Sequence, residues 1–174
     1  MSNKTYKEIL PHIDNFLFDV DGVFTDNRVL LLPDQPPVRG FHSRDAYAVR
    51  LAMMEGLRIV IVSGGHSEGV RQAFERLGVK DVFLSTSNKV TLFDQLVQAG
   101  LDPQRTAYMG DDIPDLRVMQ RVALPCCPSD AAEDIKAISR YVSRYAGGTG
   151  CVRDVLEQAM KVQGKWLTEN AHTW

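Results

Sequence analysis

The chain has 174 residues, of which 44% are hydrophobic and 24% are charged, and this is enough for one globular domain with its own core. Its net charge of −2 argues against nucleic acid as a partner. No apolar run approaches the length of a membrane span and the first residues are not those of a signal peptide, so we expect no membrane partner. The three cysteines match no zinc spacing and favour a reducing, cytoplasmic compartment: Cys126, Cys127 and Cys151.

Short apolar runs alternate with helical segments along the whole chain. This alternation predicts βαβ units, and therefore a Rossmann-like three-layer α/β sandwich with a mostly parallel sheet. The predicted strands are residues 16–20, 58–62, 82–84, 106–109, 122–124 and 141–143. The predicted helices are residues 45–55, 67–77, 88–99, 112–120, 130–137 and 151–163.

Two segments fall outside this alternation. Residues 28–41 have two apolar arms around a turn rich in proline and aspartate, which predicts a small β-hairpin. Residues 164–174 are polar apart from two tryptophans, Trp166 and Trp174, and we expect this tail to be mobile unless a partner surface holds it. The whole chain is predicted to be a single domain.

Two aspartates mark the end of the first predicted strand. Asp19 and Asp21 are separated by one residue, and Gly22 follows directly. Side chains two apart on a strand share a face, so we expect both carboxylates to face one site at the carboxyl end of this strand. Buried carboxylates repel each other unless a cation compensates, which indicates metal-assisted chemistry. A calcium loop of EF-hand type is excluded, because Phe24 and Leu30 occupy the positions that need glycine and glutamate.

Three further motifs follow later predicted strands. Ser63, Gly64 and Gly65 offer a hydroxyl and backbone amides to a phosphate oxygen, although this sequence is also common in ordinary turns. Lys89 opens a predicted helix, where a lysine is more often a solvated surface residue. A cluster of three carboxylates comes last, for which an acidic helix start is the simpler explanation: Asp111, Asp112 and Asp115.

Taken together, the four motifs resemble those of the haloacid dehalogenase superfamily of phosphohydrolases in both order and spacing. The resemblance covers a core of about residues 14–160. It implies that Asp19 is a nucleophile that forms an aspartyl-phosphate, while Asp21 donates and accepts the proton. It also implies a Mg²⁺ ion held by Asp19, Asp111 and the backbone carbonyl of Asp21.

The same resemblance implies roles for the other motif residues. Ser63 and Lys89 are expected to hold the transferring phosphate oxygens. The backbone of Gly22 and Gly64 adds further phosphate contacts. The supporting roles are an outer metal contact through water for Asp112, orientation of Lys89 for Asp115 and bracing of the loop for Thr25.

The spacing of the motifs leaves no room for a cap domain. Between Asp19 and Ser63 the chain has space for the hairpin and one helix only, and between Ser63 and Lys89 for one helix and one strand. A site without a cap stays open to water. It therefore needs either a macromolecular substrate or a neighbouring subunit that closes it.

Within the superfamily, residues 28–41, 43–47 and 146–154 resemble the 3-deoxy-D-manno-octulosonate 8-phosphate phosphatase group. That group is tetrameric and completes each site with a neighbour's residues, so the resemblance implies a homotetramer that hydrolyses a small sugar-acid phosphate in lipopolysaccharide precursor synthesis. Arginine suits a carboxylate because its fork binds two oxygens, although surface solvation explains an arginine equally well. The candidate substrate contacts are Arg44, Gly65, His66, Gly148, Thr149 and Arg153.

Several alternatives remain open from the sequence. Gly65 and His66 match neither the arginine typical of the eight-carbon group nor the glutamate of the nine-carbon group, so a phosphatase of a nine-carbon ulosonic acid 9-phosphate is the closest alternative. A non-catalytic oligomerisation module is disfavoured by the complete set of motif residues. A receiver domain phosphorylated on aspartate is disfavoured by Asp21, which favours rapid hydrolysis over storage of the phosphoryl group.

Overall fold

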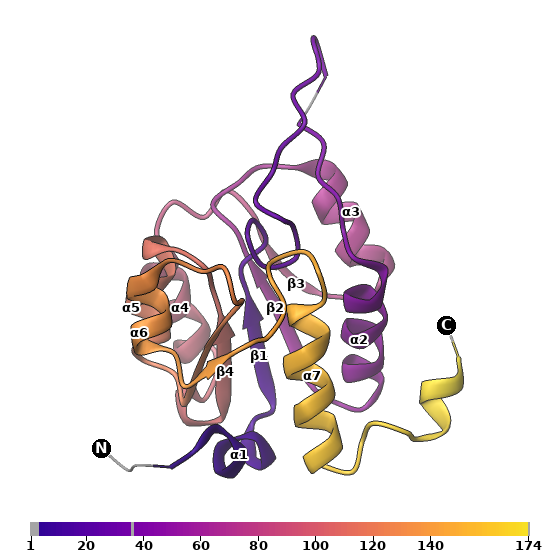
Figure 1. Cartoon of the computed structure of the whole chain (residues 1–174), viewed down its shortest axis with the longest axis vertical. Coiled ribbons are helices and arrows are strands. Elements are labelled where there is room, and N and C mark those ends of the chain that lie inside the picture. Colours follow the sequence, from indigo (N-terminus) through magenta and orange to yellow (C-terminus); the bar gives the residue numbers. More distant parts are fainter. Residues whose placement is uncertain (1–3, 36, 174) are drawn as a thin grey trace.

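A single six-stranded sheet forms the centre of the molecule in the computed structural model, which describes residues 4–35 and 37–173 (Figure 1). All neighbouring strands are parallel, in the order β3-β2-β1-β4-β5-β6. The predicted α/β class with a parallel sheet is confirmed. The strands are β1 (Asn15–Phe18), β2 (Arg58–Val62), β3 (Asp81–Phe83), β4 (Thr106–Met109), β5 (Leu124–Cys127) and β6 (Tyr141–Val142).

Helices cover both faces of the sheet (Figure 1). Because side chains alternate along a strand, Phe16 and Phe18 of β1 pack into one helical layer, whereas Leu17 packs into the other. No helix within residues 4–35 and 37–173 combines the length and apolar character that a bilayer span requires. The first layer contains α2 (Ser43–Met54), α3 (Glu68–Arg76) and α7 (Cys151–Val162), and the second contains α4 (Lys89–Gln98), α5 (Ile113–Met119) and α6 (Glu133–Ile138).

Several boundaries differ from the prediction. Strand β1 ends at Phe18, so Asp19 and Asp21 lie in the loop after the strand rather than on it. Strand β5 begins at Leu124 and continues through Pro125, beyond the predicted strand 122–124. Proline donates no hydrogen bond, but the carbonyl of Pro125 still accepts one from the amide of Arg140 at 2.9 Å. The sequence reading also omitted α1 (Tyr6–Ile9) and the 3₁₀ helices η1 (Leu10–His12), η2 (Pro103–Arg105) and η3 (Glu169–His172).

Residues 28–35 and 37–41 form a flap that projects from the carboxyl edge of the sheet, at the top of Figure 1. Its two arms are joined by an antiparallel bridge between Leu30 and Val38, with both N···O distances at 3.1 Å. Several of its apolar side chains face outward, among them Leu30, which is 58% exposed, and Leu31, which is 75% exposed. The flap therefore presents an apolar surface that no part of the described chain covers.

The C-terminal tail packs against the body of the protein, and this differs from the expectation of a mobile segment. The hydroxyl of Tyr47 in α2 donates to the carbonyl of Ala171 at 2.6 Å. The rings of Tyr47 and Trp166 lie 6.4 Å apart, edge to face. These long-range contacts stabilise the tail without a partner, and Trp174 lies outside the described residues.

Candidate functional site

The order of the strands reverses between β1 and β4, whose carboxyl ends lie side by side. Open parallel sheets bind ligands at such a point, because the connections after the two strands run to opposite faces. Asp19 follows β1 directly, and Asp111 follows β4 after one glycine. One carboxylate oxygen from each of these residues and one from Asp115 of α5 lie within 4.8 Å of one another, and all three residues are buried.

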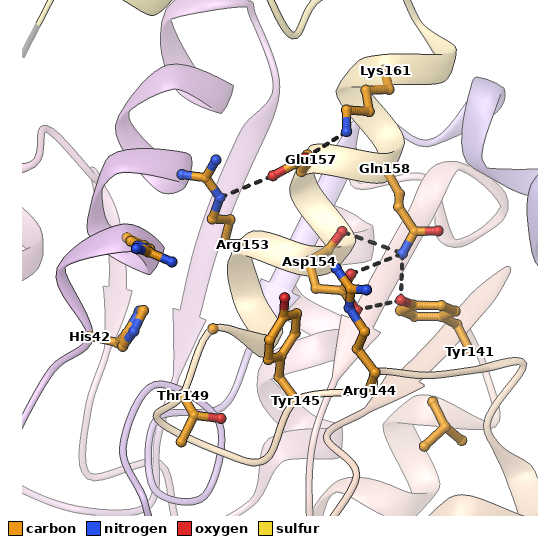
Figure 2. A pocket seen from close by; sticks show the side chains of 13 residues that line it. His42, Tyr141, Arg144, Tyr145, Thr149, Arg153, Asp154, Glu157, Gln158 and Lys161 are labelled. Carbon is orange, nitrogen blue, oxygen red and sulfur yellow. Dashed lines mark hydrogen bonds and ion pairs between the residues drawn. The ribbon is translucent and has the colours of Figure 1, made fainter.

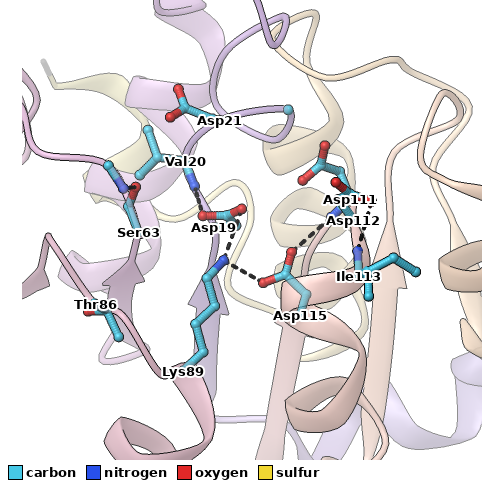
Figure 3. A network of polar contacts seen from close by, with 12 residues as sticks. Asp19, Val20, Asp21, Ser63, Thr86, Lys89, Asp111, Asp112, Ile113 and Asp115 are labelled. Atoms are coloured by element: carbon cyan, nitrogen blue, oxygen red, sulfur yellow. Dashed lines mark hydrogen bonds and ion pairs between the residues drawn. The ribbon is translucent and has the colours of Figure 1, made fainter.

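Lys89, at the start of α4, lies between two of these carboxylates (Figure 3). Its Nζ is 3.0 Å from Oδ2 of Asp19 and donates to Oδ1 of Asp115 at 2.6 Å. The hydroxyl of Tyr108 donates to the same oxygen of Asp115 at 2.6 Å, and the amide of Asp111 approaches its other oxygen at 3.3 Å. Asp115 thus holds Lys89 in place while both of its own oxygens are engaged.

The electrostatics of the cluster reflect its burial and its excess of negative charge. Burial, together with the charge of Asp115, raises the pKa of Asp19 to about 7, although Lys89 opposes this shift. Burial also raises the pKa of Asp111 to about 7, with added repulsion from Asp19 and Asp115. Burial disfavours the charge on Lys89, but the carboxylates of Asp19 and Asp115 outweigh it and raise its pKa. Three crowded carboxylates and one lysine suit a hard divalent cation, which prefers oxygen ligands and would relieve this repulsion.

Gly22 allows the loop after β1 to approach Asp111. It has a φ of +83°, and a Cβ at this position would lie 1.9 Å from Oδ2 of Asp111. The same carboxylate oxygen accepts a hydrogen bond from the side-chain amide of Asn27 at 3.2 Å. Thr25 lies inside the loop, where its hydroxyl accepts from the amide of Gly22 at 3.3 Å. Any residue larger than glycine would therefore separate the loop from the carboxylate cluster.

Ser63 follows β2 and is buried beside the same loop. Its Oγ accepts from the amide of Gly65 at 3.1 Å, and its carbonyl accepts from the amide of Thr86 at 2.9 Å. A Cβ on Gly65 would lie 3.2 Å from Oδ2 of Asp21, which brings the second motif against the first. His66 lies exposed at the rim, with its Nδ1 3.2 Å from the hydroxyl of Ser85.

Asp21 is oriented by a residue that the sequence analysis did not single out. Its carboxylate forms a two-pronged ion pair with Arg39, with Nε 2.7 Å from Oδ1 and Nη2 3.2 Å from Oδ2. In Figure 3 no dashed line joins Asp21 to Asp19 or Lys89. Strand β1 ends before both Asp19 and Asp21, so strand geometry does not direct their side chains to one face. This expectation from the sequence is wrong.

Asp112 lies at the edge of this cluster. Its Oδ1 accepts from the amide of Ile113 at 2.8 Å, so it caps the amino end of α5. This is the acidic helix start that the sequence offered as the simpler explanation of the motif.

Comparison with known proteins gives close relatives along most of the chain, although no model of a protein family matches it. The 3-deoxy-D-manno-octulosonate 8-phosphate phosphatase of Escherichia coli K12 is 32% identical over 150 residues, which cover 86% of this chain and 80% of that protein. This chain belongs to the octulosonate 8-phosphate phosphatase family of the haloacid dehalogenase superfamily.

Solved structures of octulosonate phosphatases have the same fold. The enzyme from Yersinia pestis superimposes with a TM-score of 0.89 at 27% identity, covering 92% of this chain and 87% of that chain. The enzyme from Moraxella catarrhalis, solved with a magnesium ion, a phosphate ion and a KDO molecule, gives a TM-score of 0.88 at 26% identity and covers 92% of each chain. The resemblance to the superfamily, drawn from the four motifs, and the resemblance to this phosphatase family, drawn from residues 28–41, 43–47 and 146–154, are both confirmed.

The residues predicted from the sequence to contact the substrate lie in two separate regions of the structure. Arg44, Thr149 and Arg153 line a cavity of about 450 Å³ between α2, β6 and α7 (Figure 2), and the described lining of this cavity includes no residue of the four motifs. Arg153 is already paired there, with Nε 3.0 Å from Oε2 of Glu157. Gly148 instead lies against the loop after β1, where its amide donates to the carbonyl of Val23 at 2.9 Å.

Proposed function

We propose that this protein is a Mg²⁺-dependent phosphatase that hydrolyses 3-deoxy-D-manno-octulosonate 8-phosphate to the free sugar acid and phosphate. The observation that carries the proposal is the buried group of Asp19, Asp111 and Asp115 beside Lys89, at the reversal point of the sheet. The eight-carbon substrate and the metal are those named for the relatives and for the Moraxella structure. The proposal places the enzyme in the cytoplasm, in the synthesis of lipopolysaccharide precursors, and its three free, buried cysteines agree with a reducing compartment.

The reaction proceeds in two steps. In the first, a carboxylate oxygen of Asp19 attacks the phosphorus, the bond from phosphorus to the sugar oxygen breaks, and Asp21 gives its proton to that oxygen. In the second, Asp21 takes a proton from a water molecule as the water displaces the oxygen of Asp19 and releases phosphate. Lys89 and Ser63 bind the phosphoryl oxygens through both steps. A bound magnesium ion, held by Asp19, Asp111 and the carbonyl of Asp21, would neutralise charge between the nucleophile and the phosphate.

We also propose that the enzyme works as a homotetramer in which a neighbouring subunit closes the site. The support is the flap, which projects from the carboxyl edge of the sheet where the site lies (Figure 1) and exposes the side chains of Leu30 and Leu31. Apolar side chains gathered on a projecting segment are typical of a surface that is covered in an assembly.

Phosphate release from 3-deoxy-D-manno-octulosonate 8-phosphate in the presence of Mg²⁺ tests the reaction. Asp19→Asn should lower kcat by a factor of about 10³ or more, because an amide oxygen is a poor nucleophile. Asp94→Asn is the matched control, since Asp94 pairs with Arg121 on the surface at 2.6 Å, and it should retain activity. Hydrolysis that survives in Asp19→Asn would exclude this nucleophile, and faster hydrolysis of a nine-carbon 9-phosphate would refute the substrate.

A further inference from the structure

One largely enclosed cation beside the site belongs to none of the four motifs. Arg39 follows the bridging residue Val38 of the flap, and its side chain is only 11% exposed. It borders a small cavity together with Asp21, Ser63 and Gly65. Because arginine is rarely buried to this extent unless its charge is paired, its contacts indicate what it does there.

Two of the three guanidinium nitrogens of Arg39 hold the carboxylate of Asp21. The two contacts, Nε to Oδ1 at 2.7 Å and Nη2 to Oδ2 at 3.2 Å, fix both the position and the rotation of the carboxylate. The hydroxyl of Thr25 adds a longer contact to Oδ1 at 3.4 Å. Asp21 is the proposed proton donor and acceptor, so the flap residue Arg39 sets the geometry of proton transfer.

The third nitrogen, Nη1 of Arg39, is buried and has no hydrogen-bond partner among the described residues. A buried donor left unpaired destabilises a protein, and more so when it carries charge. Space for the guanidinium exists because position 65 is glycine: a Cβ there would lie 3.4 Å from Nη2. A charged donor left unpaired on a residue that lines a cavity with Ser63 and Asp21 indicates that a group of the substrate is its partner.

We propose that Arg39 is a positioning residue that holds Asp21 for proton transfer and binds an oxygen of the leaving alcohol through Nη1. This inference rests on the proposed function, since it assigns Arg39 a part in the same reaction. A sugar-acid phosphate carries hydroxyl groups close to the phosphoester carbon, and their oxygens accept hydrogen bonds from a guanidinium. Leaving alcohols that need a proton and carry a neighbouring hydroxyl are the substrates that benefit from Arg39.

Two substrates with different leaving groups test this role. The value of kcat/KM covers the steps up to departure of the leaving group. Nitrophenolate departs without a proton and carries no neighbouring hydroxyl, whereas the sugar alkoxide needs both contacts. Arg39→Ala should therefore lower kcat/KM for 3-deoxy-D-manno-octulosonate 8-phosphate about 100-fold and change kcat/KM for p-nitrophenyl phosphate little. Arg39→Lys keeps the charge but loses the two-pronged contact. Its ratio of kcat/KM for the sugar phosphate to kcat/KM for p-nitrophenyl phosphate should therefore lie between the ratios of the wild-type protein and Arg39→Ala.

The matched control is Arg76→Ala, which removes an exposed arginine at the end of α3, outside the flap, and should leave both substrates unchanged. Adding Arg39→Ala to Asp21→Asn should slow hydrolysis of the sugar phosphate less than Arg39→Ala slows the wild-type protein, because the proton transfer is already lost and only the Nη1 contact remains to be removed. If Arg39→Ala does not fold, kcat/KM on the two substrates is compared between Arg39→Lys and the wild-type protein.

Equal losses on both substrates in Arg39→Ala or Arg39→Lys would overturn the proposal, and so would an unchanged rate on the sugar phosphate. A wild-type protein that hydrolyses p-nitrophenyl phosphate but no ulosonic acid phosphate would refute the substrate of the proposed function instead. In that case the Arg39 variants are compared on glycerol 3-phosphate and p-nitrophenyl phosphate, because glycerol 3-phosphate also has an alkoxide leaving group beside a hydroxyl. The two failures are therefore distinguishable.

Discussion

At the scale of single residues, Asp45 is a buried carboxylate that lies outside the site. It lies in α2, is fully buried, and its Oδ1 accepts from the amide of Arg153 in the first turn of α7 at 2.6 Å. Its Oδ2 has no hydrogen-bond partner among the described residues, and Nδ1 of His42 is 3.9 Å away. Burial raises the pKa of Asp45 to about 6, although the hydrogen bond from Arg153 opposes this shift.

Asp45→Asn should therefore change how stability depends on pH. Because the folded pKa of about 6 lies above the ordinary aspartate pKa of 3.8, the folded protein keeps a proton that the unfolded chain has lost. The stabilisation is complete below about pH 4 and is lost as the pH rises through 6. Asparagine stays neutral, so Asp45→Asn should remove this loss, which is on the order of 2–3 kcal/mol. Urea unfolding of both proteins between pH 4 and pH 7.5 measures the difference, and parallel curves would contradict the assignment.

At the scale of elements, the loop before α7 supports the nucleophile loop after β1. The amide of Gly148 donates to the carbonyl of Val23 at 2.9 Å. A Cβ on Gly147 would lie 2.0 Å from the carbonyl oxygen of Gly22, so the two backbones touch without any space for a side chain. Gly22 in turn lies against Asp111, and the contact therefore reaches the carboxylate cluster.

Gly147→Ala should displace the nucleophile loop. We expect a loss of roughly 1–3 kcal/mol in the free energy of unfolding, as for other overpacked positions, and a lower kcat. Urea unfolding and phosphate release measure the two effects. Gly69→Ala is the matched control: Gly69 lies in α3, a Cβ there has only a 3.9 Å contact with Ser67, and the change should add about 0.5–1 kcal/mol. Full activity in Gly147→Ala would show that the loop contact does not support the site.

The order of elements was predictable because buried parallel strands read as short apolar runs, such as residues 58–62, between amphipathic helices. The motifs could be assigned to one edge for the same reason. The local sequence pattern could not predict contacts between segments that are distant in sequence. Arg39 of the flap pairs with Asp21, and Trp166 of the tail packs against Tyr47 of α2. Asp112 shows the converse, since its helix-capping role is a local property.

At the scale of the whole molecule, the flap gathers several exposed apolar side chains, among them Leu30, Leu31 and Val38, on one projecting segment. The open carboxyl edge of the sheet lies at its base, so the same assembly that buries the flap is proposed to close the site.

A double substitution, Leu30→Ser with Leu31→Ser, should dissociate the proposed tetramer, because the two exposed side chains would lose their apolar contact with neighbours. Light scattering coupled to size-exclusion chromatography should give a smaller mass, and kcat/KM for the sugar phosphate should fall. Leu167→Ser is the control, since Leu167 is 78% exposed on the tail, far from the flap in sequence. A wild-type protein with the mass of one chain would refute the assembly.

The contact between Gly148 and Val23 also orders events during synthesis of the protein. The nucleophile emerges from the ribosome before the backbone that supports its loop and before α7, the helix behind it. A nascent chain released before residue 148 carries Asp19, Lys89 and Asp111 but lacks this support, so truncated products should be inert toward the cell's phosphate esters.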